Sequence, residues 1–474
     1  MRGIYSDNDT IAAIATPPGN GGIGIIKISG NKAVDTAASV FQPSSIVTGL
    51  KNNDFPKSRH LYHGHVIDHK NRQTLDEVLL VVMSGPASYT GEDVVEIQAH
   101  SGIAVLQAIL ELVMENDIRL ADPGEFTRRA FLNGRIDLTQ AEAVIDVIQA
   151  RSAAALDVAT SHAAGSLRVK IEKIRDDLSE TLVNIEAVID FSDDVEENLA
   201  GDRQAVDIEE RVIAPLEEII RAYDDGRYII DGLKVAIVGR PNVGKSSLLN
   251  CLLEKEKAIV TPVPGTTRDL VEDIVAVQGI PVVIADTAGI HDSDDPVEII
   301  GMEKTRQCIK DAHITIFVID AANPFCPEDC AVHEAISDKN MIIAANKQDI
   351  AAGNDNADQI LEMPENWHDK VIVKTSALYN KGIDNLKNEI EKAVTKSRPR
   401  IKDSSLIPNL RQKTAIEKSL NSAQMAVSAI KSGMPDELVA IDIKESIQML
   451  DEITGADISD DLLDRIFGQF CIGK

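Results

Sequence analysis

Residues 239–246, G-R-P-N-V-G-K-S, have the types and spacing of a loop that binds phosphate. Gly239, Gly244, Lys245 and Ser246 match the pattern G-x-x-x-x-G-K-[ST]. Glycines allow backbone N–H groups to surround an anion, and the N-terminus of a following helix adds positive potential. Lys245 is expected to contact the terminal phosphates, and the Ser246 hydroxyl to ligate Mg²⁺. This stretch therefore predicts a nucleotide-binding site.

Three later stretches indicate that the nucleotide is GTP. V-V-I-A-D-T-A-G at 282–289 ends an apolar run in Asp286, which can hold Mg²⁺ through water, and the Gly289 N–H can face the terminal phosphate. A-N-K-Q-D at 345–349 supplies Asp349, which can accept both N–H groups on the edge of guanine. T-S-A-L at 375–378 offers the Ala377 N–H to the guanine carbonyl. In this order the motifs indicate a GTP-binding domain related to translation factors.

Residues 261–269, T-P-V-P-G-T-T-R-D, are a candidate switch loop, with a plain solvated loop as the alternative. Ras-like switches carry a water-orienting glutamine after the D-x-x-G element, but Ile290 stands here. Arg268 is the nearest candidate for an arginine finger. The nucleotide-binding set expected from all these motifs, with Ser246 and Thr267 on Mg²⁺, is Asn242, Val243, Gly244, Lys245, Ser246, Ser247, Thr266, Thr267, Asp286, Thr287, Ala288, Gly289, Asn346, Lys347, Asp349, Ser376 and Ala377.

The elements that must position these motifs fall into distinct stretches. Residues 1–118 combine β-rich runs at 23–29, 77–83 and 94–100 with one helical repeat at 103–114, as in an α+β domain. Helical patterning dominates residues 119–232 and returns in 397–474. We predict a multidomain chain in which an α/β P-loop GTPase domain, residues 233–396, is inserted into a discontinuous α-helical domain. Such an insertion ties both ends of a nucleotide switch to one helical bundle.

Helical spacing begins near residue 123, and the start of this segment is locally basic, with Arg128, Arg129 and Arg135. Its apolar stripe is predicted to face a bundle and comprises Phe131, Leu138, Ala141, Val144, Ile145 and Ile148. Further helical patterns are expected at 156–189, 208–223, 410–430 and 437–453.

Composition limits the classes of partner and compartment. The 474 residues include 76 acidic and 48 basic side chains, a net charge of −28, so a general polyanion-binding surface is not expected. The five cysteines form no C-x-x-C pair, which argues against a disulfide framework or zinc site. A metal site at Cys326, Cys330 and His333 stays open beside ordinary thiols. Without a targeting segment or an apolar run of about 20 residues, we expect a cytoplasmic, soluble protein.

Two glycine-rich stretches, residues 17–24 and 88–93, admit two interpretations, a close backbone approach to a ligand or a hairpin turn. The terminal F-C-I-G-K, residues 470–474, likewise suits either a frayed end or a reactive thiol at Cys471.

Taken together, the chain resembles the MnmE (TrmE) family of tRNA modification GTPases over nearly its full length. The resemblance rests on D-T-I-A-A-I-A-T-P-P-G at the start, T-G-E-D-V-V-E-I-Q, P-G-E-F-T, the GTPase motifs and the terminal F-C-I-G-K. It implies a GTP phosphohydrolase that, with the FAD protein MnmG (GidA), adds an aminomethyl or carboxymethylaminomethyl group to carbon 5 of the wobble uridine of certain tRNAs. The implied assembly is a homodimer that joins MnmG as a heterotetramer, with no membrane or DNA partner.

The resemblance also implies cofactors and site residues. The N-terminal domain would bind a tetrahydrofolate derivative (5-formyl or 5,10-methylene) and mediate dimerisation; the matching positions, including the C-terminal one, are Asn20, Glu92, Arg135 and Lys474. K⁺ would replace an arginine finger and promote GTPase-domain dimerisation, held near Asn242, Thr261, Val263 and Thr266. Glu298 matches the acid that orients water, although a helix-capping carboxylate is the alternative, and Cys471 matches a cysteine implicated in the modification.

Three positions depart from the family pattern. Asn20 stands where members usually carry arginine, His291 where arginine is common, and Ser101 in place of a usual glycine. A GTP-regulated ribosome assembly factor would share the phosphate loop and P-G-T-T-R-D, but it should carry an RNA-binding or second GTPase domain. A simple folate-binding aminomethyltransferase would not need the guanine motifs. The tRNA-modification interpretation is therefore preferred.

Overall fold

The computed structural model describes residues 9–17, 19, 21–44, 57–190, 197–254, 272–277, 280–286, 309–323, 326–336, 340–351, 367, 370–396 and 406–474. The chain divides into two compact units: unit 1 comprises residues 1–145, 163–205 and 421–474, and unit 2 comprises residues 146–162 and 206–420. The predictions that lie outside the described residues concern Asn20, Thr261, Val263, Thr266, Thr267, Arg268, Thr287, Ala288, Gly289, Ile290, His291 and Glu298.

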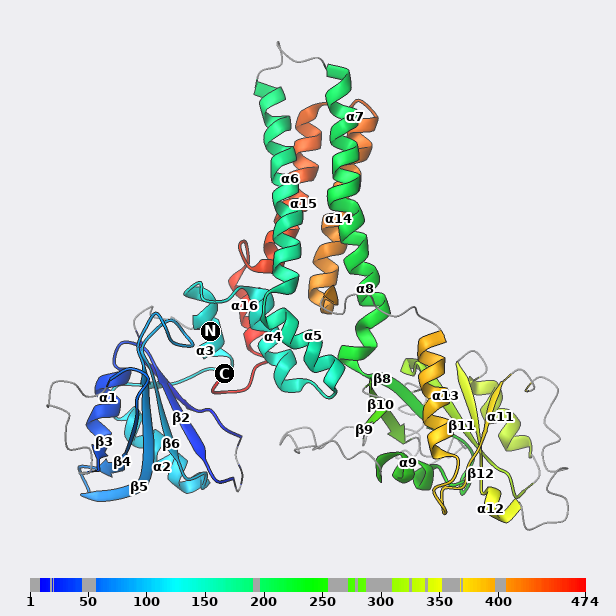
Figure 1. Ribbon diagram of the computed structural model, residues 1–474, viewed down its shortest axis with the longest axis horizontal. Helices are drawn as coiled ribbons and strands as arrows, with labels where there is room; N and C mark the ends of the chain where they lie inside the picture. Colours follow the sequence, from blue (N-terminus) through cyan, green and yellow to red (C-terminus); the bar gives the residue numbers. More distant parts are fainter. Residues whose placement is uncertain are drawn as a thin grey trace, which may run out of the picture. The chain divides into compact units, whose positions relative to one another are not determined.

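Unit 1 contains a seven-stranded sheet with the order β3-β4-β5-β6-β2-β1-β7 (Figure 1). Its neighbouring strands run antiparallel, apart from the parallel pair β1 and β7. The strands are β1 (Ile11–Ile14), β2 (Gly24–Ser29), β3 (Phe41–Pro43), β4 (Leu61–Asp68), β5 (Gln73–Met83), β6 (Val94–Ala99) and β7 (Arg119–Leu120). Residues 88–93 lie in the connection between the antiparallel strands β5 and β6, and the stretch 17–24 includes positions 18 and 20, which lie outside the described residues.

Two helices, α1 (Ala33–Val40) and α2 (Ile103–Met114), share a core with one face of this sheet. Side chains alternate between the faces of a strand, so β5 buries Val78, Leu80 and Val82 in this core. The intervening side chains, such as Leu79 and Val81, are only half-buried on the other face. The predicted α+β character of this part of the chain is confirmed.

The helices between residues 123 and 190, which belong partly to unit 1 and partly to unit 2, differ in two details from the sequence pattern. The pattern after residue 123 forms α3 (Glu125–Leu132) and α4 (Leu138–Gln149). The pattern at 156–189 is broken between α5 (Ala153–Ala163) and α6 (Ser166–Asp190), where Gly165 has φ +89° and ends the first helix. Ile148, predicted on the buried stripe, is 50% exposed because the cluster around Leu138 that this stripe joins ends at Ile145.

Side chains far apart in sequence meet in this unit. The long helix α6 packs along α15 (Asp436–Thr454), and Arg175 Nε lies 2.5 Å from Asp451 Oδ1. Helix α16 (Asp460–Phe467) packs on α3, where Arg128 Nη1 lies 2.7 Å from Asp464 Oδ1. The remaining helices of the helical segments are α7 (Glu197–Ile208), the π-helix η1 (Glu209–Ile213), α8 (Ala214–Asp231) and α14 (Leu410–Lys431). Within the described part of the chain, each helix is too short or too polar to cross a membrane.

Unit 2 contains a six-stranded sheet with the order β13-β12-β11-β8-β10-β9, parallel except for the edge pair β10 and β9. Its strands are β8 (Leu233–Val238), β9 (Glu272–Val277), β10 (Ile280–Asp286), β11 (Ile314–Asp320), β12 (Met341–Asn346) and β13 (Val371–Lys374). The helices of this α/β fold are α9 (Lys245–Glu254), α11 (Pro327–Ile336), α12 (Gln348–Ala351) and α13 (Ile383–Lys396).

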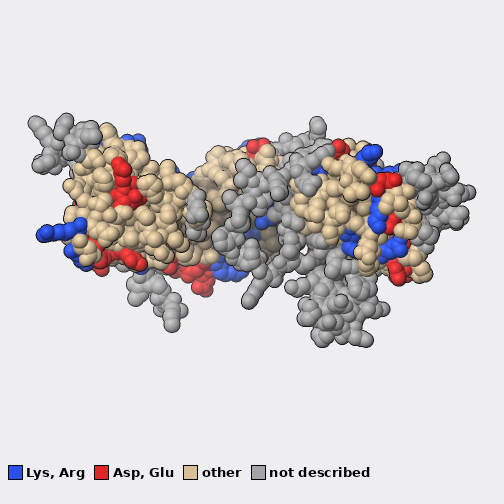
Figure 2. Space-filling model, turned by 90° about the horizontal axis from the view of Figure 1, so that it is seen from below, with Lys and Arg blue, Asp and Glu red and all other residues tan. Residues whose placement is uncertain are grey.

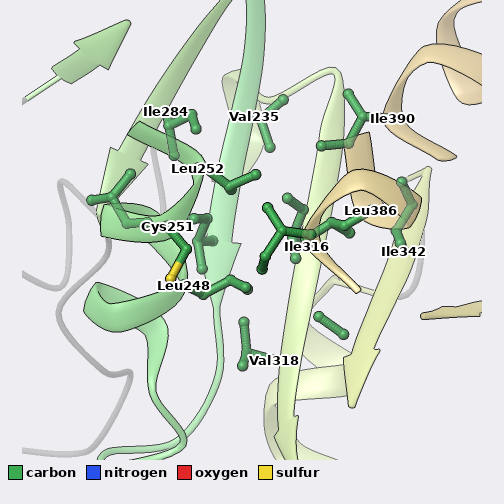
Figure 3. Packing of buried hydrophobic residues seen from close by; sticks show 14 of the residues in the cluster. Val235, Leu248, Cys251, Leu252, Ile284, Ile316, Val318, Ile342, Leu386 and Ile390 are labelled. Carbon is green, nitrogen blue, oxygen red and sulfur yellow. The ribbon is translucent and has the colours of Figure 1, made fainter. Parts of the chain in front are cut away.

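The core on one face of this sheet explains the apolar runs in the sequence. Leu248 and Leu252 of α9 and Leu386 of α13 pack against Ile316 and Ile342 of the central strands (Figure 3). Every residue of β11 is buried, as expected for a parallel strand covered on both faces. This packing fixes the carboxyl ends of β8, β10 and β12, where the predicted motifs begin.

Candidate nucleotide-binding site

The phosphate loop connects β8 to α9, and its backbone requires glycine at two positions. A Cβ atom on Gly239 would lie 2.4 Å from the Val318 carbonyl oxygen. Gly244 has φ +98°, and a Cβ atom there would lie 2.4 Å from Asn346 Nδ2. Asn242 also has positive φ, +64°. The loop therefore lies close to neighbouring strands. Its positive φ angles give the backbone a bend of the kind that turns N–H groups toward an anion.

Lys245 and the two serines after it begin α9. The Lys245 ammonium donates to the Gly239 carbonyl oxygen at 2.8 Å and to that of Arg240 at 3.0 Å, so it lies over the loop. Ser246 and Ser247 are exposed in the first turn of the helix. The backbone of Asp286 is in parallel register with Ile237, so β10 ends beside the start of the loop. The structure thus brings the predicted phosphate and Mg²⁺ motifs to the same sheet edge.

Asn346 connects the phosphate loop to the predicted guanine-reading loop. Its side chain is buried at 2% exposure; Nδ2 donates to the Val243 carbonyl oxygen, and Oδ1 accepts from the Ala377 N–H, each at 3.0 Å. The Ala377 N–H, predicted to reach the guanine carbonyl, is therefore engaged by Asn346 in this structure. A buried thiol also contacts this turn, because Cys251 Sγ donates to the Ala377 carbonyl oxygen at 3.0 Å.

Lys347 and Asp349 complete the second motif. Lys347 has φ +66°, and its ammonium donates to the Asn242 carbonyl oxygen and to Asp320 Oδ2, both at 2.8 Å. Asp349 Oδ1 accepts the Ser376 hydroxyl at 2.5 Å, which fixes the carboxylate at this edge of the sheet. The Lys347–Asn242 contact joins two predicted motifs across 105 residues of sequence, so the two motifs lie beside each other.

Asp320 was missed by the sequence analysis. Burial raises the pKa of its carboxyl, but hydrogen bonds from Lys347, the Ala322 N–H and Asn323 outweigh burial and hold the pKa below its ordinary value. It is therefore a charged partner for the lysine that braces the phosphate loop. A signal existed, since Asp320 ends an apolar strand just as Asp286 does.

Arg240 of the loop is held by the start of α11. Its Nε lies 3.3 Å from Asp329 Oδ1, and its Nη1 donates to Cys326 Sγ at 3.5 Å. Cys326 Sγ in turn donates to Asp329 Oδ2 at 3.3 Å. His333 instead stacks on Trp367, with ring centroids 4.4 Å apart. Among the described residues no three His, Cys, Asp or Glu side chains are placed to hold a metal.

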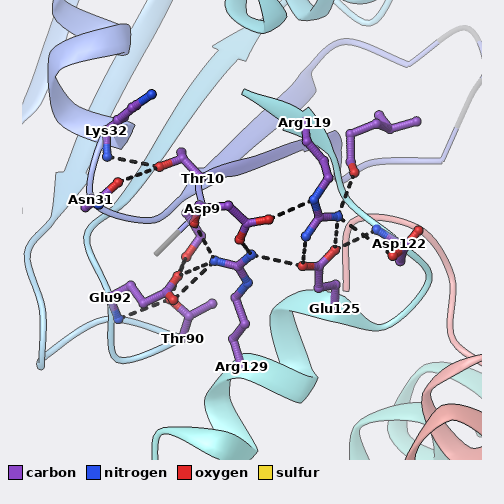
Figure 4. A network of polar contacts seen from close by, with 12 residues as sticks. Asp9, Thr10, Asn31, Lys32, Thr90, Glu92, Arg119, Asp122, Glu125 and Arg129 are labelled. Atoms are coloured by element: carbon purple, nitrogen blue, oxygen red, sulfur yellow. Dashed lines mark hydrogen bonds and ion pairs between the residues drawn. The ribbon is translucent and has the colours of Figure 1, made fainter. Parts of the chain in front are cut away.

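Unit 1 holds a second polar network, centred on Arg129 of α3 (Figure 4). Arg129 Nη2 donates to Asp9 Oδ1 at 2.5 Å and to Glu125 Oε1 at 2.9 Å, while Nη1 lies 3.2 Å from Glu92. Arg119 donates to both Glu125 oxygens, at 2.6 and 2.9 Å. Burial raises the pKa of Glu125, but hydrogen bonds led by Arg119 bring it below its ordinary value. The sequence analysis named Glu92 as a site residue and Arg129 only as part of a basic stretch, and it did not predict that they form one network.

The predicted residues of unit 1 surround the loop between β5 and β6. Glu92 Oε2 accepts the Ser29 hydroxyl at 2.7 Å, and Arg135 Nη1 donates to the Tyr89 carbonyl oxygen at 2.8 Å. Arg135 also borders an open cavity of about 710 Å³, whose other lining residues include Arg59, Val81, Met83, Pro86 and Tyr89.

The C-terminal tail is fixed rather than frayed, which settles one alternative. Phe470 is 5% exposed, and the Cys471 carbonyl oxygen accepts the Gly124 N–H at 3.4 Å. Gly473 has φ +91°, and a Cβ atom there would lie 2.7 Å from the Ile14 carbonyl oxygen of β1. The Cys471 thiol is exposed on this fixed backbone.

Charge is mixed on the one face that Figure 2 shows. Figure 2 shows Lys and Arg side chains in small groups beside Asp and Glu on the visible face. This agrees with the net charge of −28 and with local rather than general recognition of a polyanion.

Comparisons with known proteins cover nearly the whole chain. Residues 138–471 match the model of the MnmE helical domain, and residues 10–135 match the model of the GTP-binding protein TrmE N-terminus. The tRNA modification GTPase MnmE of Clostridioides difficile is 44% identical over 98% of this chain and 99% of its own. The same-named protein of Alkaliphilus metalliredigens is 43% identical over the same shares.

Solved structures match over a smaller part. Era in complex with MgGDPNP and ribosomal RNA is 30% identical over 40% of this chain and 65% of its own, with a TM-score of 0.29. The G domain of the T. maritima FeoB iron transporter is 26% identical over 34% of this chain and 99% of its own, with a TM-score of 0.27.

Proposed function

Because the chain belongs to the MnmE family of tRNA modification GTPases, we propose that it hydrolyses GTP to drive modification of carbon 5 of the wobble uridine in certain tRNAs. The single observation that carries the GTPase part is the bridge formed by Asn346 between the phosphate loop and the Ala377 turn. The tRNA part rests on relatives of this name that are 40–44% identical over nearly the full chain.

In this function the described residues bind and orient GTP. The phosphate loop, whose backbone requires Gly239 and Gly244, offers N–H groups to the phosphates, and Lys245 supplies a buried ammonium over this loop. Asp349, oriented by Ser376, accepts the edge N–H groups of guanine. Ser246 and Thr267 would hold Mg²⁺, which neutralises phosphate charge when bound. Rejection of adenine follows because adenine would leave the Asp349 carboxylate without these partners in the complex, which is costly.

Apart from Asn242, the residues that we propose for hydrolysis lie outside the described residues. Glu298 orients the attacking water, and K⁺ near Asn242, Thr261, Val263 and Thr266 takes the place of an arginine finger. A finger contributes roughly 10³–10⁵ in rate, so a cation that takes over this work makes an energetically meaningful contribution. K⁺ also promotes pairing of two GTPase domains across a homodimer.

Unit 1 supplies the one-carbon chemistry in this proposal. A tetrahydrofolate derivative would bind near Glu92, Arg135 and Lys474, and the cavity of about 710 Å³ beside Arg135 is large enough for part of such a molecule. The half-buried sheet face that carries Leu79 and Val81 supports dimerisation through residues 1–118. In this proposal residues 119–232 and 397–474 form one helical domain, and residues 233–396 form the GTPase domain. The protein acts in the cytoplasm with MnmG as its partner.

The proposal is tested by mass spectrometry of tRNA nucleosides from cells lacking the gene. Loss of the modified wobble uridine, restored by the wild-type chain and by the surface control Glu437→Ala but not by Glu298→Ala, is the expected result. Purified Glu298→Ala should still bind GTP while its turnover falls. Unchanged nucleosides in the deletion strain would refute the modification function, and unimpaired turnover would refute the role of Glu298.

A further inference from the structure

Cys326 is a half-buried thiol beside the phosphate loop, and the nucleotide chemistry described above does not use it. It stands immediately before Pro327, the first residue of the ten-residue helix α11. The Asp329 carboxylate accepts the Cys326 N–H at 3.2 Å, and the Asp329 N–H donates to the Cys326 carbonyl oxygen at 3.0 Å. These reciprocal contacts form a capping box, so the start of the helix fixes the position of the thiol.

Charged side chains surround the sulfur. Arg240 Nη1 donates to Cys326 Sγ at 3.5 Å. The thiol in turn donates to Asp329 Oδ2 at 3.3 Å, and Glu328 Oε2 lies 3.6 Å away. The Asp329 side chain is 2% exposed, and Arg240 Nε holds it at 3.3 Å. A thiol whose proton points at a carboxylate that a third group orients has the arrangement of an activated nucleophile, and the guanidinium and the helix N-terminus stabilise negative charge that develops on sulfur.

Two buried polar atoms of this cluster have no hydrogen-bond partner among the described residues. They are Arg240 Nε and Asp329 Oδ1, which pair as charges at 3.3 Å without the alignment of a hydrogen bond. Buried polar atoms in this condition are uncommon and costly. One oxygen atom added to the neighbouring sulfur would accept from Arg240 and, as a hydroxyl, would donate to Asp329. The two atoms therefore suit an oxidised form of Cys326.

Arg240 connects this cluster to the phosphate-binding lysine. Its carbonyl oxygen accepts the Lys245 ammonium at 3.0 Å, beside the carbonyl oxygen of Gly239 at 2.8 Å. The residue that contacts the thiol thus belongs to the backbone that holds Lys245. An oxygen inserted between Arg240 and Asp329 separates their ion pair and shifts Arg240, so it also disturbs the place where the terminal phosphates bind.

We infer that Cys326 is a modification site at which a hydroperoxide forms a sulfenic acid, and that this product weakens nucleotide binding through Arg240. The inference rests on the GTP-binding part of the proposed function. Sulfur attacks one oxygen of hydrogen peroxide, so an S–O bond forms and the O–O bond breaks. The departing hydroxide takes the thiol proton, passed on by Asp329, and leaves as water; sulfur is oxidised by two electrons and the peroxide is reduced by two. Two equivalents of a thiol reverse the change, because the first displaces water and forms a mixed disulfide and the second releases the cysteine.

Trapping with dimedone locates the oxidation. The full-length protein is treated with hydrogen peroxide, and trapped sulfenic acids are measured by peptide mass spectrometry. Cys326 should be labelled about tenfold faster than Cys330, which lies one helical turn later and is also half-buried. Asp329→Asn should slow the labelling of Cys326 about tenfold because it removes the base. Glu328→Gln, at the exposed carboxylate, is the matched control and should change the rate by less than about twofold.

Release of a fluorescent GDP analogue measures the effect on the nucleotide site. Before oxidation, wild type and Cys326→Ser should bind the analogue within about twofold of each other, because the serine hydroxyl keeps a donor to Asp329. After peroxide treatment, release from the wild type should become about tenfold faster, and dithiothreitol should restore the original rate. Cys326→Ser should not respond to peroxide, whereas Cys330→Ser and Cys471→Ser should respond as the wild type does.

Absence of dimedone on Cys326 overturns the inference, and so does a labelled protein that releases GDP at the rate of the untreated protein. An equal response of Cys326→Ser to peroxide also overturns it, because another residue would then be the site. Failure of the untreated wild type to bind GDP overturns the proposed function instead.

Discussion

Replacing Asn346 with alanine tests whether one buried amide organises the nucleotide site. Its carboxamide donates to the Val243 carbonyl oxygen of the phosphate loop and accepts the Ala377 N–H, both at 3.0 Å. The side chain is 2% exposed, so water cannot readily replace it. Alanine would leave a carbonyl and an N–H without these partners in a buried place.

The free-energy cost of Asn346→Ala follows from the two hydrogen bonds that it removes. A buried polar group left without its partner costs about 1–3 kcal/mol, so the two together cost about 2–4 kcal/mol when part of the site relaxes. If most of this cost falls on the nucleotide-bound conformation, the dissociation constant for GDP rises about 30-fold or more. The remainder should appear as a lower melting temperature of unit 2.

The assay is a fluorescence titration with a labelled GDP analogue, with thermal unfolding measured on the same samples. Asn385→Ala provides the matched control, because Asn385 is exposed on α13. The reasoning is refuted if Asn346→Ala binds GDP within about twofold of wild type and melts at the same temperature.

Three further perturbations test other parts of the fold. Glu125→Gln, at a side chain with 2% exposure, should cost about 1–3 kcal/mol at pH 7, because a neutral amide replaces the carboxylate that accepts from Arg119 and Arg129, while Arg129 keeps its contacts with Asp9 and Glu92. Because the pKa of Glu125 is lowered, its contribution is present above about pH 4 and is lost as pH falls through the folded-state pKa, so urea unfolding of wild type and variant should converge in acid. A gap that stays constant with pH would contradict this. Burial, aided by Lys370, lowers the pKa of His333, so the unfolded chain takes up the proton first and stability falls below about pH 6.5. His333→Phe should reduce the drop in melting temperature of unit 2 between pH 7.5 and 5.5, and an equal drop would argue against it. Gly124→Ala, which forces a Cβ atom to 2.7 Å from a carbonyl oxygen, should release residues 470–474 to carboxypeptidase, and unchanged digestion would show that the tail does not depend on this contact.

Much of the nucleotide site could be predicted because its chemistry is local in sequence. Gly244, Lys245 and Asp349 belong to short motifs whose residue types are set by phosphate and guanine, and the structure places them at one sheet edge. The strands of this sheet could also be predicted from local sequence, because parallel strands covered on both faces appear as continuous apolar runs. Asp320 could have been predicted in the same way, because it also ends an apolar strand.

The network in unit 1 was not predictable in this way. Arg129 and Asp9 are 120 residues apart, and no local pattern distinguishes a buried arginine from a solvated one. The exposed position of Ile148 was missed for a similar reason, because helical periodicity gives the direction of a side chain but not where its packing partner ends. Both errors concern contacts between segments, which depend on the tertiary fold.

The C-terminal tail shows how such contacts change a functional interpretation. As sequence, F-C-I-G-K gives no reason to expect order, because a short terminal segment usually frays. In the structure Phe470 is buried and both Gly124 and Gly473 occupy places where a Cβ atom would collide with backbone, so the backbone around Cys471 is held at both sides. Of the described cysteines, Cys471 alone is exposed. A thiol that is accessible yet carried on a fixed backbone has the property that a reacting or positioning group requires, whereas a frayed thiol would lose that orientation. The proposed role of Cys471 in the modification therefore depends on the glycine contacts as much as on the thiol.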